Sequence, residues 1–161
     1  MGTPSPLQRF AERDYRAVVS AVARITGDHL TAADSVQDAV LALLENPPRL
    51  PVENLAAWIT VVATNLTRDR QRRRAAESRA LGRVGLVPTT LEVTFFDEDI
   101  RVAIECLPPR QRQICILHYV LDESVESIAL RLGVTAGAVK THLFRGRRAL
   151  AARLAPVPAA A

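Results

Sequence analysis

The stretch GVTAGAVKTHLFRGRRAL, residues Gly133 to Leu150, decides how the C-terminal part of this chain folds. Its first glycine favours a sharp turn, Thr135 can cap a helix that starts directly after it, and apolar residues recur on one side of that helix. The same helix carries four basic residues and no acidic one: Lys140, Arg145, Arg147 and Arg148. A helix with an apolar side and a purely basic side is typical of a segment that contacts a polyanion.

The residues before Gly133 predict a helix-turn-helix. Ser124 can cap a short helix whose apolar face is formed by Val125, Ile128, Ala129 and Leu132. In a helix-turn-helix, the second helix enters the major groove of DNA and presents its N-terminal half to the base edges. Arginine and lysine read guanine edges or hold phosphates, so the pattern favours DNA binding. A helical hairpin with a solvated basic face is the alternative.

Charge is distributed unevenly along the 161 residues, whose net charge is +4 and whose isoelectric point is near 9.8. Residues 68–83 contain seven arginines and two acids, and residues 131–153 contain six basic residues and no acid. Between these blocks, residues 92–126 contain eight acids and three arginines. Two basic blocks separated by an acidic stretch indicate two contact surfaces for nucleic acid.

The whole chain is expected to be helical, because alanine, leucine and arginine dominate and aromatic residues make up only 4%. Thr31 should cap the second helix, with Asp34 three residues further on as a weak capping box. Glycines, a proline and threonines mark residues 81–94 as a linker, and the tail from Ala155 should be disordered. The periodicity predicts helices over residues 7–26, 31–45, 53–77, 95–107, 108–121, 124–132 and 135–154.

Nothing in the sequence indicates catalysis, a cofactor or a metal site. Cys106 and Cys115 lack metal-ligand spacing and lie among apolar residues, so we expect reduced packing residues, with a disulfide as the alternative. Asp34 and Asp38 stand one helical turn apart, but no third carboxylate or phosphate-binding loop accompanies them as a magnesium site would require. Because no such constellation is present, we do not expect an enzyme. The start of the chain does not read as a signal peptide, so a cytoplasmic protein is expected.

Three further stretches give the chain its resemblance to a known family. DSVQDAVLALLEN (residues 34–46) is followed by NLAAWITVVATNLTRDRQRRR (residues 54–74), and then by LPPRQRQICILHYV (residues 107–120) before the helix-turn-helix. In this order they closely resemble the extracytoplasmic-function (ECF) bacterial RNA polymerase sigma factors, over about residues 8–154. The resemblance implies two small helical domains, sigma region 2 (residues 7–80) and sigma region 4 (residues 97–154). A flexible linker (residues 81–96) joins them, and residues 155–161 form the tail.

The resemblance assigns the first acidic helix to the polymerase. In the family, a helix with a D-x-V-Q-[DE] run docks on the clamp helices of core RNA polymerase. Acidic charge along this helix suits a basic partner surface, whereas a solvated amphipathic face is the alternative. The implied polymerase-binding residues are Asp34, Val36, Gln37, Asp38, Leu41 and Glu45.

Region 2 of the family also recognises and melts the minus-ten promoter element. The loop at residues 46–54 corresponds to the one that captures a flipped base, but it is rich in proline and lacks aromatic residues, which leaves the base preference open. Thr64 and Thr67 are expected at the DNA backbone, Arg74 among the phosphate contacts, and Trp58 in the core. The implied minus-ten residues are Pro48, Arg49, Asn54, Asn65, Arg68, Arg70, Arg72 and Arg73.

Region 4 of the family reads the minus-thirty-five element with its helix-turn-helix. The two arginines near the middle of the last helix look like phosphate clamps, and the arginine after the double proline can contact the DNA backbone. The implied minus-thirty-five residues are Arg110, Thr135, Lys140, Thr141, Arg145, Arg147 and Arg148.

The function implied is promoter recognition, promoter melting and transcription initiation together with core RNA polymerase. Family members are commonly held inactive by an anti-sigma factor, which is a further expected partner. Ala160 and Ala161 resemble a tag read by an ATP-dependent protease, with a frayed alanine-rich end as the alternative. A stand-alone helix-turn-helix regulator is the rival function, but the sequence leaves no apolar dimerisation face free. An adaptor without a DNA role would not explain two arginine blocks.

Overall fold

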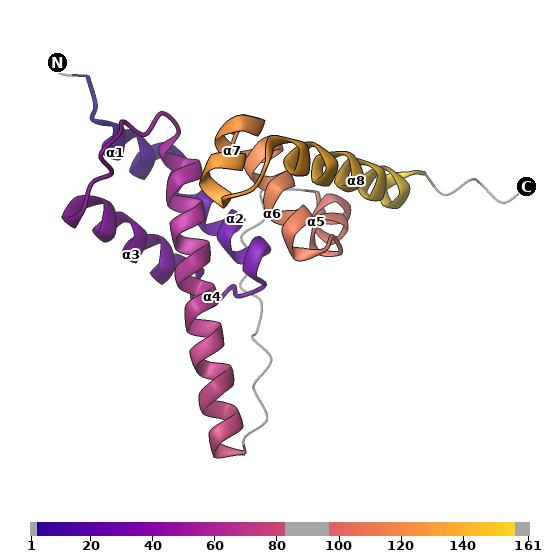
Figure 1. Cartoon of the computed structure of the whole chain (residues 1–161), viewed down its shortest axis with the longest axis horizontal. Coiled ribbons are helices and arrows are strands. Elements are labelled where there is room, and N and C mark those ends of the chain that lie inside the picture. Colours follow the sequence, from indigo (N-terminus) through magenta and orange to yellow (C-terminus); the bar gives the residue numbers. More distant parts are fainter. Residues whose placement is uncertain (1–2, 83–96, 157–161) are drawn as a thin grey trace, which may run out of the picture. The chain divides into compact units, whose positions relative to one another are not determined.

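The computed structural model describes residues 3–82 and 97–156, and every regular element in these two ranges is a helix (Figure 1). The chain divides into two compact units, residues 1–93 and residues 94–161, each with its own core. The prediction of an all-α chain with two small helical domains is therefore confirmed. The linker core and the terminal alanines Ala160 and Ala161 lie outside the described residues.

The first unit is built around one long helix. Its elements are α1 (Pro6–Arg9), the π-helical turn η1 (Phe10–Asp14), α2 (Tyr15–Thr26), α3 (Ala32–Glu45) and α4 (Leu55–Leu81). The predicted helix over residues 7–26 is one helical run with a π turn in its first half. Ser5 caps its start, and Gly27 ends it in a left-handed conformation with φ of 73°.

The core of the first unit lies where α2, α3 and the first half of α4 pack against one another. Burying each valine or isoleucine side chain there contributes about 1.5–3 kcal/mol to folding. The second half of α4 runs on beyond α2 and α3 (Figure 1), and Arg72, Arg73 and Arg74 are exposed there. The fully buried core residues include Val18, Val22, Val36, Ala39, Ile59 and Ala63.

The start of α3 differs from the prediction that Thr31 caps it. Thr31 stands at the N-cap position without a side-chain cap bond, and its buried hydroxyl has no partner among the described residues. Asp28 takes the place that the capping box gave to Asp34, because its Oδ1 accepts a hydrogen bond from the Thr31 backbone N–H at 3.0 Å. Asn54 caps α4 by accepting from the Ala57 N–H at 3.0 Å.

The second unit is built around one long C-terminal helix, against which three shorter helices pack. Its elements are α5 (Glu98–Glu105), α6 (Pro109–Cys115), the π turn η2 (Ile116–Val120), α7 (Val125–Leu132) and α8 (Ala136–Leu154). Pro109 occupies the first turn of α6, where a missing N–H costs nothing. The buried side chains of this core include Leu107, Ile114, Ile116, Leu117, Ile128, Val139 and Leu143.

The helix-turn-helix of α7 and α8 forms as the sequence predicted. Ser124 caps α7 by accepting from the Ser127 N–H, and Thr135 caps α8 by accepting from the Ala138 N–H, both at 3.1 Å. Gly133 joins the two helices with φ of 64°, a left-handed value that favours glycine.

Both cysteines are free thiols, and only one of them is a core residue. Cys115 is buried between α6 and α8, as expected, whereas Cys106 is exposed, so the packing role predicted for it is wrong. Gly146 of α8 passes close to Cys115, and a Cβ at this glycine would lie 2.4 Å from the Cys115 Sγ. No helix in the described part of the chain is long and apolar enough to cross a membrane.

Candidate nucleic-acid and partner interfaces

The outer face of α3 combines carboxylates with exposed leucines. Asp34, Gln37, Leu41 and Glu45 fall on one exposed stripe of the helix, and Leu41 is 54% exposed. Leu44 is 60% exposed and also belongs to this face. Two leucines in solvent beside carboxylates form a surface suited to a partner with an apolar groove and basic surroundings. We call Asp34, Gln37, Leu41, Leu44 and Glu45 the α3 face.

Two of the predicted polymerase-binding residues lie apart from this face. Val36 is fully buried in the core of the first unit, so it anchors α3 to that core and does not reach a partner surface. Asp38 is about half exposed and forms an ion pair with Arg70 of α4. Its carboxylate is therefore shared between the partner side of α3 and the packing of α3 on α4.

The loop between α3 and α4 keeps its predicted contact residues in solvent. Pro48 and Arg49 are exposed, and the neighbouring Leu50 is 78% exposed. Asn54 at the end of the loop uses its side-chain oxygen to cap α4, which fixes the direction in which the loop enters the helix.

Polar residues in the middle of α4 divide into an exposed and a buried set. Asn65 is exposed, whereas Thr64 and Thr67 are fully buried, so the expectation that these threonines contact DNA is wrong. The Thr67 hydroxyl bonds Ser35 of α3 at 2.8 Å and the Ala63 carbonyl at 2.9 Å. Trp58 is half-buried in the first half of the same helix.

The arginines of α4 are not a uniform stripe. Arg72 pairs with Asp69 on its own helix, and Arg74 lies 3.6 Å from the buried carboxylate of Asp28. Arg73 is exposed and forms no hydrogen bond or ion pair with the residues that the structure describes. Arg73 is therefore the most available phosphate contact of this run.

The remaining two predicted contacts on α4, Arg68 and Arg70, are both partly buried. Arg68 already has a partner within the protein. Arg70 is turned toward α3, where it bonds Ser35 and Asp38.

In the second unit, α8 presents its basic residues on the side away from the core. Lys140, Thr141, Arg145 and Arg148 are exposed, and Val139 and Leu143 on the opposite side are buried. The Thr141 hydroxyl bonds the Gly137 carbonyl at 3.0 Å. The Thr135 residue is exposed, and its hydroxyl is used as the cap of α8.

Two aromatic residues that the sequence reasoning missed orient the arginines of α8. Arg147 donates a hydrogen bond to the Tyr119 hydroxyl at 3.0 Å, and the Arg148 guanidinium lies 5.8 Å from the centre of the Phe144 ring. Phe144 is 53% exposed beside the basic residues. An aromatic residue in that place was visible in the sequence, although its exposure depended on the rotation of α8 about its axis.

Charged and polar residues of neighbouring segments hold the helix-turn-helix in place. Arg110 donates to the Leu132 carbonyl at 3.2 Å, so it ends α7 in addition to any contact with DNA. Arg131 pairs with Glu123 at 3.2 Å, and the Glu123 side chain is only 3% exposed. The His118 ring bonds the Glu123 carbonyl at 2.8 Å, which holds the segment between η2 and α7.

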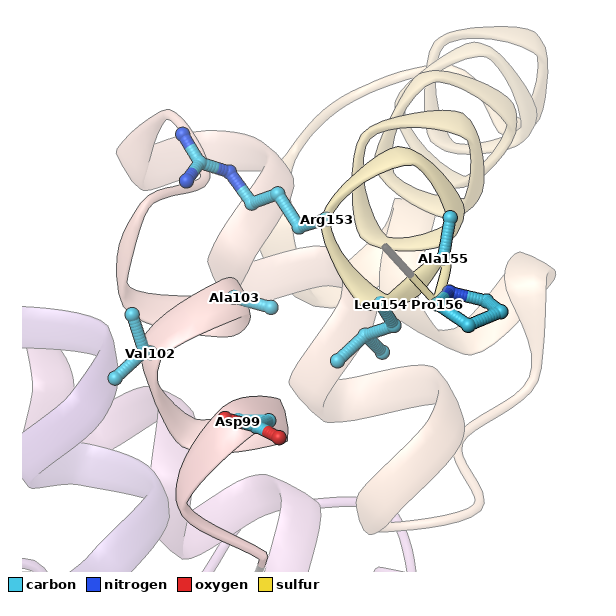
Figure 2. Close-up of a pocket in the computed structure, with 7 residues that line it drawn as sticks. All are labelled: Asp99, Val102, Ala103, Arg153, Leu154, Ala155 and Pro156. Carbon is cyan, nitrogen blue, oxygen red and sulfur yellow. The ribbon is translucent and has the colours of Figure 1, made fainter. Parts of the chain in front are cut away.

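A pocket of about 640 Å³ opens in the second unit between α5 and the end of α8 (Figure 2). Its lining includes Asp99, Val102 and Arg153, and none of the predicted contact residues. The described residues contain no group of three or more acidic, histidine or cysteine side chains that could hold a metal ion.

Comparison with known proteins agrees with this two-unit arrangement. The family model for Sigma-70 region 2 matches residues 10–77, and that for Sigma-70, region 4 matches residues 97–150. A structure of the sigma factor RpoE in complex with the anti-sigma factor NepR from Bartonella quintana has the same fold, with a TM-score of 0.72. That similarity covers 87% of this chain and 91% of that chain at 23% identity.

Relatives by sequence carry the same family name. The ECF RNA polymerase sigma factor EcfG of Rhodopseudomonas palustris is 33% identical over 137 residues, which cover 81% of this chain and 75% of EcfG. SigW of Bacillus subtilis is 28% identical, over 81% of this chain and 79% of SigW. SigE of Mycolicibacterium smegmatis is 27% identical over 89% of this chain, which spans only 58% of that longer relative. The chain belongs to the ECF family of RNA polymerase sigma factors.

Proposed function

We propose that this protein binds core RNA polymerase through the α3 face and directs it to promoters. The observation that carries the proposal is the chemistry of that face, in which Leu41 and Leu44 are exposed between carboxylates. DNA cannot be its partner, because the carboxylates repel phosphates and the leucines need an apolar contact. A protein partner with basic and apolar surface satisfies both requirements.

Promoter melting is assigned to the loop before α4 and to the exposed residues of α4. Arg73 supplies positive charge for the displaced strand, and Asn65 offers an amide that can both donate to and accept from a base edge. The exposed Pro48–Arg49 segment is stiff enough to form one wall of a pocket for an unstacked base. The affinity of these contacts should fall steeply with salt.

Recognition of the upstream element is assigned to α8. Lys140, Thr141 and Arg145 lie in the N-terminal half of this helix, which a helix-turn-helix presents to base edges. Arg147 and Arg148 follow on the next turn and hold phosphates, with their orientation set by Tyr119 and Phe144.

Two modest DNA surfaces on one chain gain affinity from tethering. Once polymerase holds both units, the second DNA contact becomes intramolecular. The overall affinity is then the product of the two separate affinities and the effective concentration of the second site. The protein contributes binding and melting, and the polymerase contributes the active site.

Two further partners follow from the family. The related RpoE was crystallised with an anti-sigma factor, and an anti-sigma protein that covers the α3 face would keep this chain from polymerase. An ATP-dependent protease that reads Ala160 and Ala161 is a second means of control. Replacing both alanines with aspartate should lengthen the half-life of the protein in cells, and an unchanged half-life would contradict this assignment.

Holoenzyme formation tests the proposal. The protein, labelled at the exposed thiol of Cys106, is titrated with core RNA polymerase, and binding is followed by fluorescence anisotropy. Asp34→Arg should weaken binding at least about tenfold, because it reverses one of the two carboxylate charges of the α3 face. Glu12→Arg makes the same charge change on the exposed surface of η1 and should leave binding unchanged. A wild-type protein that does not bind core polymerase would overturn the proposal.

A further inference from the structure

Arg70 is bound into the packing of α3 on α4. Its side chain is 31% exposed, and its guanidinium reaches two residues of α3 that stand one helical turn apart. One terminal nitrogen donates to the Ser35 hydroxyl at 2.6 Å, and the other pairs with Asp38. Ser35 is fully buried and is also bonded by Thr67, so the arginine closes a network that joins the two helices.

If the Arg70 guanidinium turned outward to a phosphate, this network would break. The Ser35 hydroxyl would lose its charged donor in a buried place, and Asp38 would lose its counter-charge. Arg73, three residues further on, has no such ties within the described residues and is exposed. A phosphate contact of a DNA strand with Arg73 therefore costs less free energy than the same contact with Arg70.

The same contacts influence the partner side of α3. Asp34 and Asp38 are four residues apart on one helix, an arrangement in which like charges repel each other. Arg70 offsets that repulsion and holds the half-exposed Asp38 carboxylate in one orientation beside the α3 face. The charge pattern that α3 presents to a partner thus depends on a residue of α4.

We propose that Arg70 is a positioning residue for polymerase docking and not a contact to the promoter strand. The inference rests on the proposed function, in which the α3 face binds polymerase. Arg70 holds the first half of α3 in register on α4 and fixes the Asp38 carboxylate, so that the docking face is already formed in the free protein. Preorganisation of this kind raises affinity by lowering the ordering cost of binding.

The test compares Arg70→Gln with Arg73→Gln, which removes the same charge from the same helix. We expect Arg70→Gln to weaken binding to core polymerase about tenfold, within the range found for residues of one hydrogen-bond network. Arg73→Gln should change it less than about twofold. Trp58 fluorescence confirms that the variants are folded. Arg70→Lys keeps the positive charge but lacks the two-pronged guanidinium, so it should bind core polymerase with intermediate affinity.

Two further readouts separate positioning from general damage. In an Asp38→Asn background, Arg70→Gln should have less than a third of its effect on core affinity, because the carboxylate that Arg70 holds in place is already gone. With a 25-nucleotide single-stranded DNA, the slope of log affinity against log salt should fall by about 0.7 for Arg73→Gln and should not change for Arg70→Gln.

The outcomes are distinguishable from a failure of the proposed function. If the wild-type protein does not bind core polymerase, the function itself is wrong. If the wild type and Arg70→Gln bind core polymerase equally well, Arg70 does not position the docking face and the inference is overturned. If Arg70→Gln lowers the salt slope as much as Arg73→Gln, Arg70 is a strand contact and the inference is overturned as well. An Arg70→Gln effect that is undiminished in the Asp38→Asn background would also overturn it.

Discussion

Replacing Gly146 with alanine should destabilise the second unit, although alanine is the better helix former. A Cβ at this position would lie 2.4 Å from the Cys115 Sγ, and both residues are buried where α8 packs on α6. The cysteine side chain is short, so relief requires a rotamer change or a shift of α8 away from α6. Overpacking of this kind costs about 1–3 kcal/mol, and the helix propensity of alanine returns about 1 kcal/mol. The contact is severe enough that we expect a net loss of about 1–2 kcal/mol.

The sign of this effect should reverse when the sulfur is removed. In a Cys115→Ala background, the new methyl group has space, and Gly146→Ala should then stabilise the unit by up to about 1 kcal/mol through helix propensity. Denaturant unfolding followed by far-UV circular dichroism measures both changes. Trp58 is the only tryptophan and lies in the first unit, so its fluorescence serves as an internal control that should not move.

A stabilising Gly146→Ala in the wild-type background would refute this reasoning. An equal loss in the wild-type and Cys115→Ala backgrounds would refute it as well, because the clash would then have another origin.

Three further predictions concern the second unit. Thr135→Ala should cost about 1 kcal/mol through loss of the α8 cap, whereas Thr135→Ser should cost little; an equal loss for both would show that the cap bond is not the cause. Arg131→Met should lower the free energy of unfolding by about 3 kcal/mol, because it leaves the Glu123 carboxylate buried without its counter-charge. A change below about 0.5 kcal/mol in denaturant unfolding would contradict this. Burial raises the pKa of Cys115 from about 9 to about 11, so a thiol reagent at pH 8 should modify Cys106 alone in the native protein. Since the folded pKa is the higher one, the thiol's contribution to stability is complete below pH 9 and is lost as the pH rises toward 11, which the difference between wild type and Cys115→Ala should show.

Local signals predicted the helix-turn-helix correctly. The caps at Ser124 and Thr135 and the left-handed turn at Gly133 depend on a few neighbouring residues, and the structure shows all three. The same kind of reasoning was wrong at Thr31, whose hydroxyl does not cap α3 and whose own N–H bonds Asp28 and not the capping-box residue Asp34. Competition between two nearby capping residues is not visible in a motif.

The details of the candidate surfaces could not be predicted, because they depend on how helices rotate and cross. Leu44 fits the apolar stripe of α3 by spacing, yet the axial rotation of the helix turns it into solvent. Arg70 and Asp38 are 32 residues apart, and only the packing of α3 on α4 brings them together. The buried positions of Thr64 and Thr67 follow from the same packing. Sequence patterns predicted whether a surface is acidic or basic. Tertiary contacts decide which of its side chains stay exposed and can contact a partner.

Mapping of transcription start sites tests the central claim most directly. Purified bacterial core RNA polymerase is incubated with this protein and a library of genomic DNA fragments, and the 5′ ends of the transcripts are sequenced. We predict discrete starts that require the protein and share two upstream sequence elements, one for each unit. Transcripts without specific starts, together with DNA binding by the protein in the absence of polymerase, would contradict the claim and favour a stand-alone regulator.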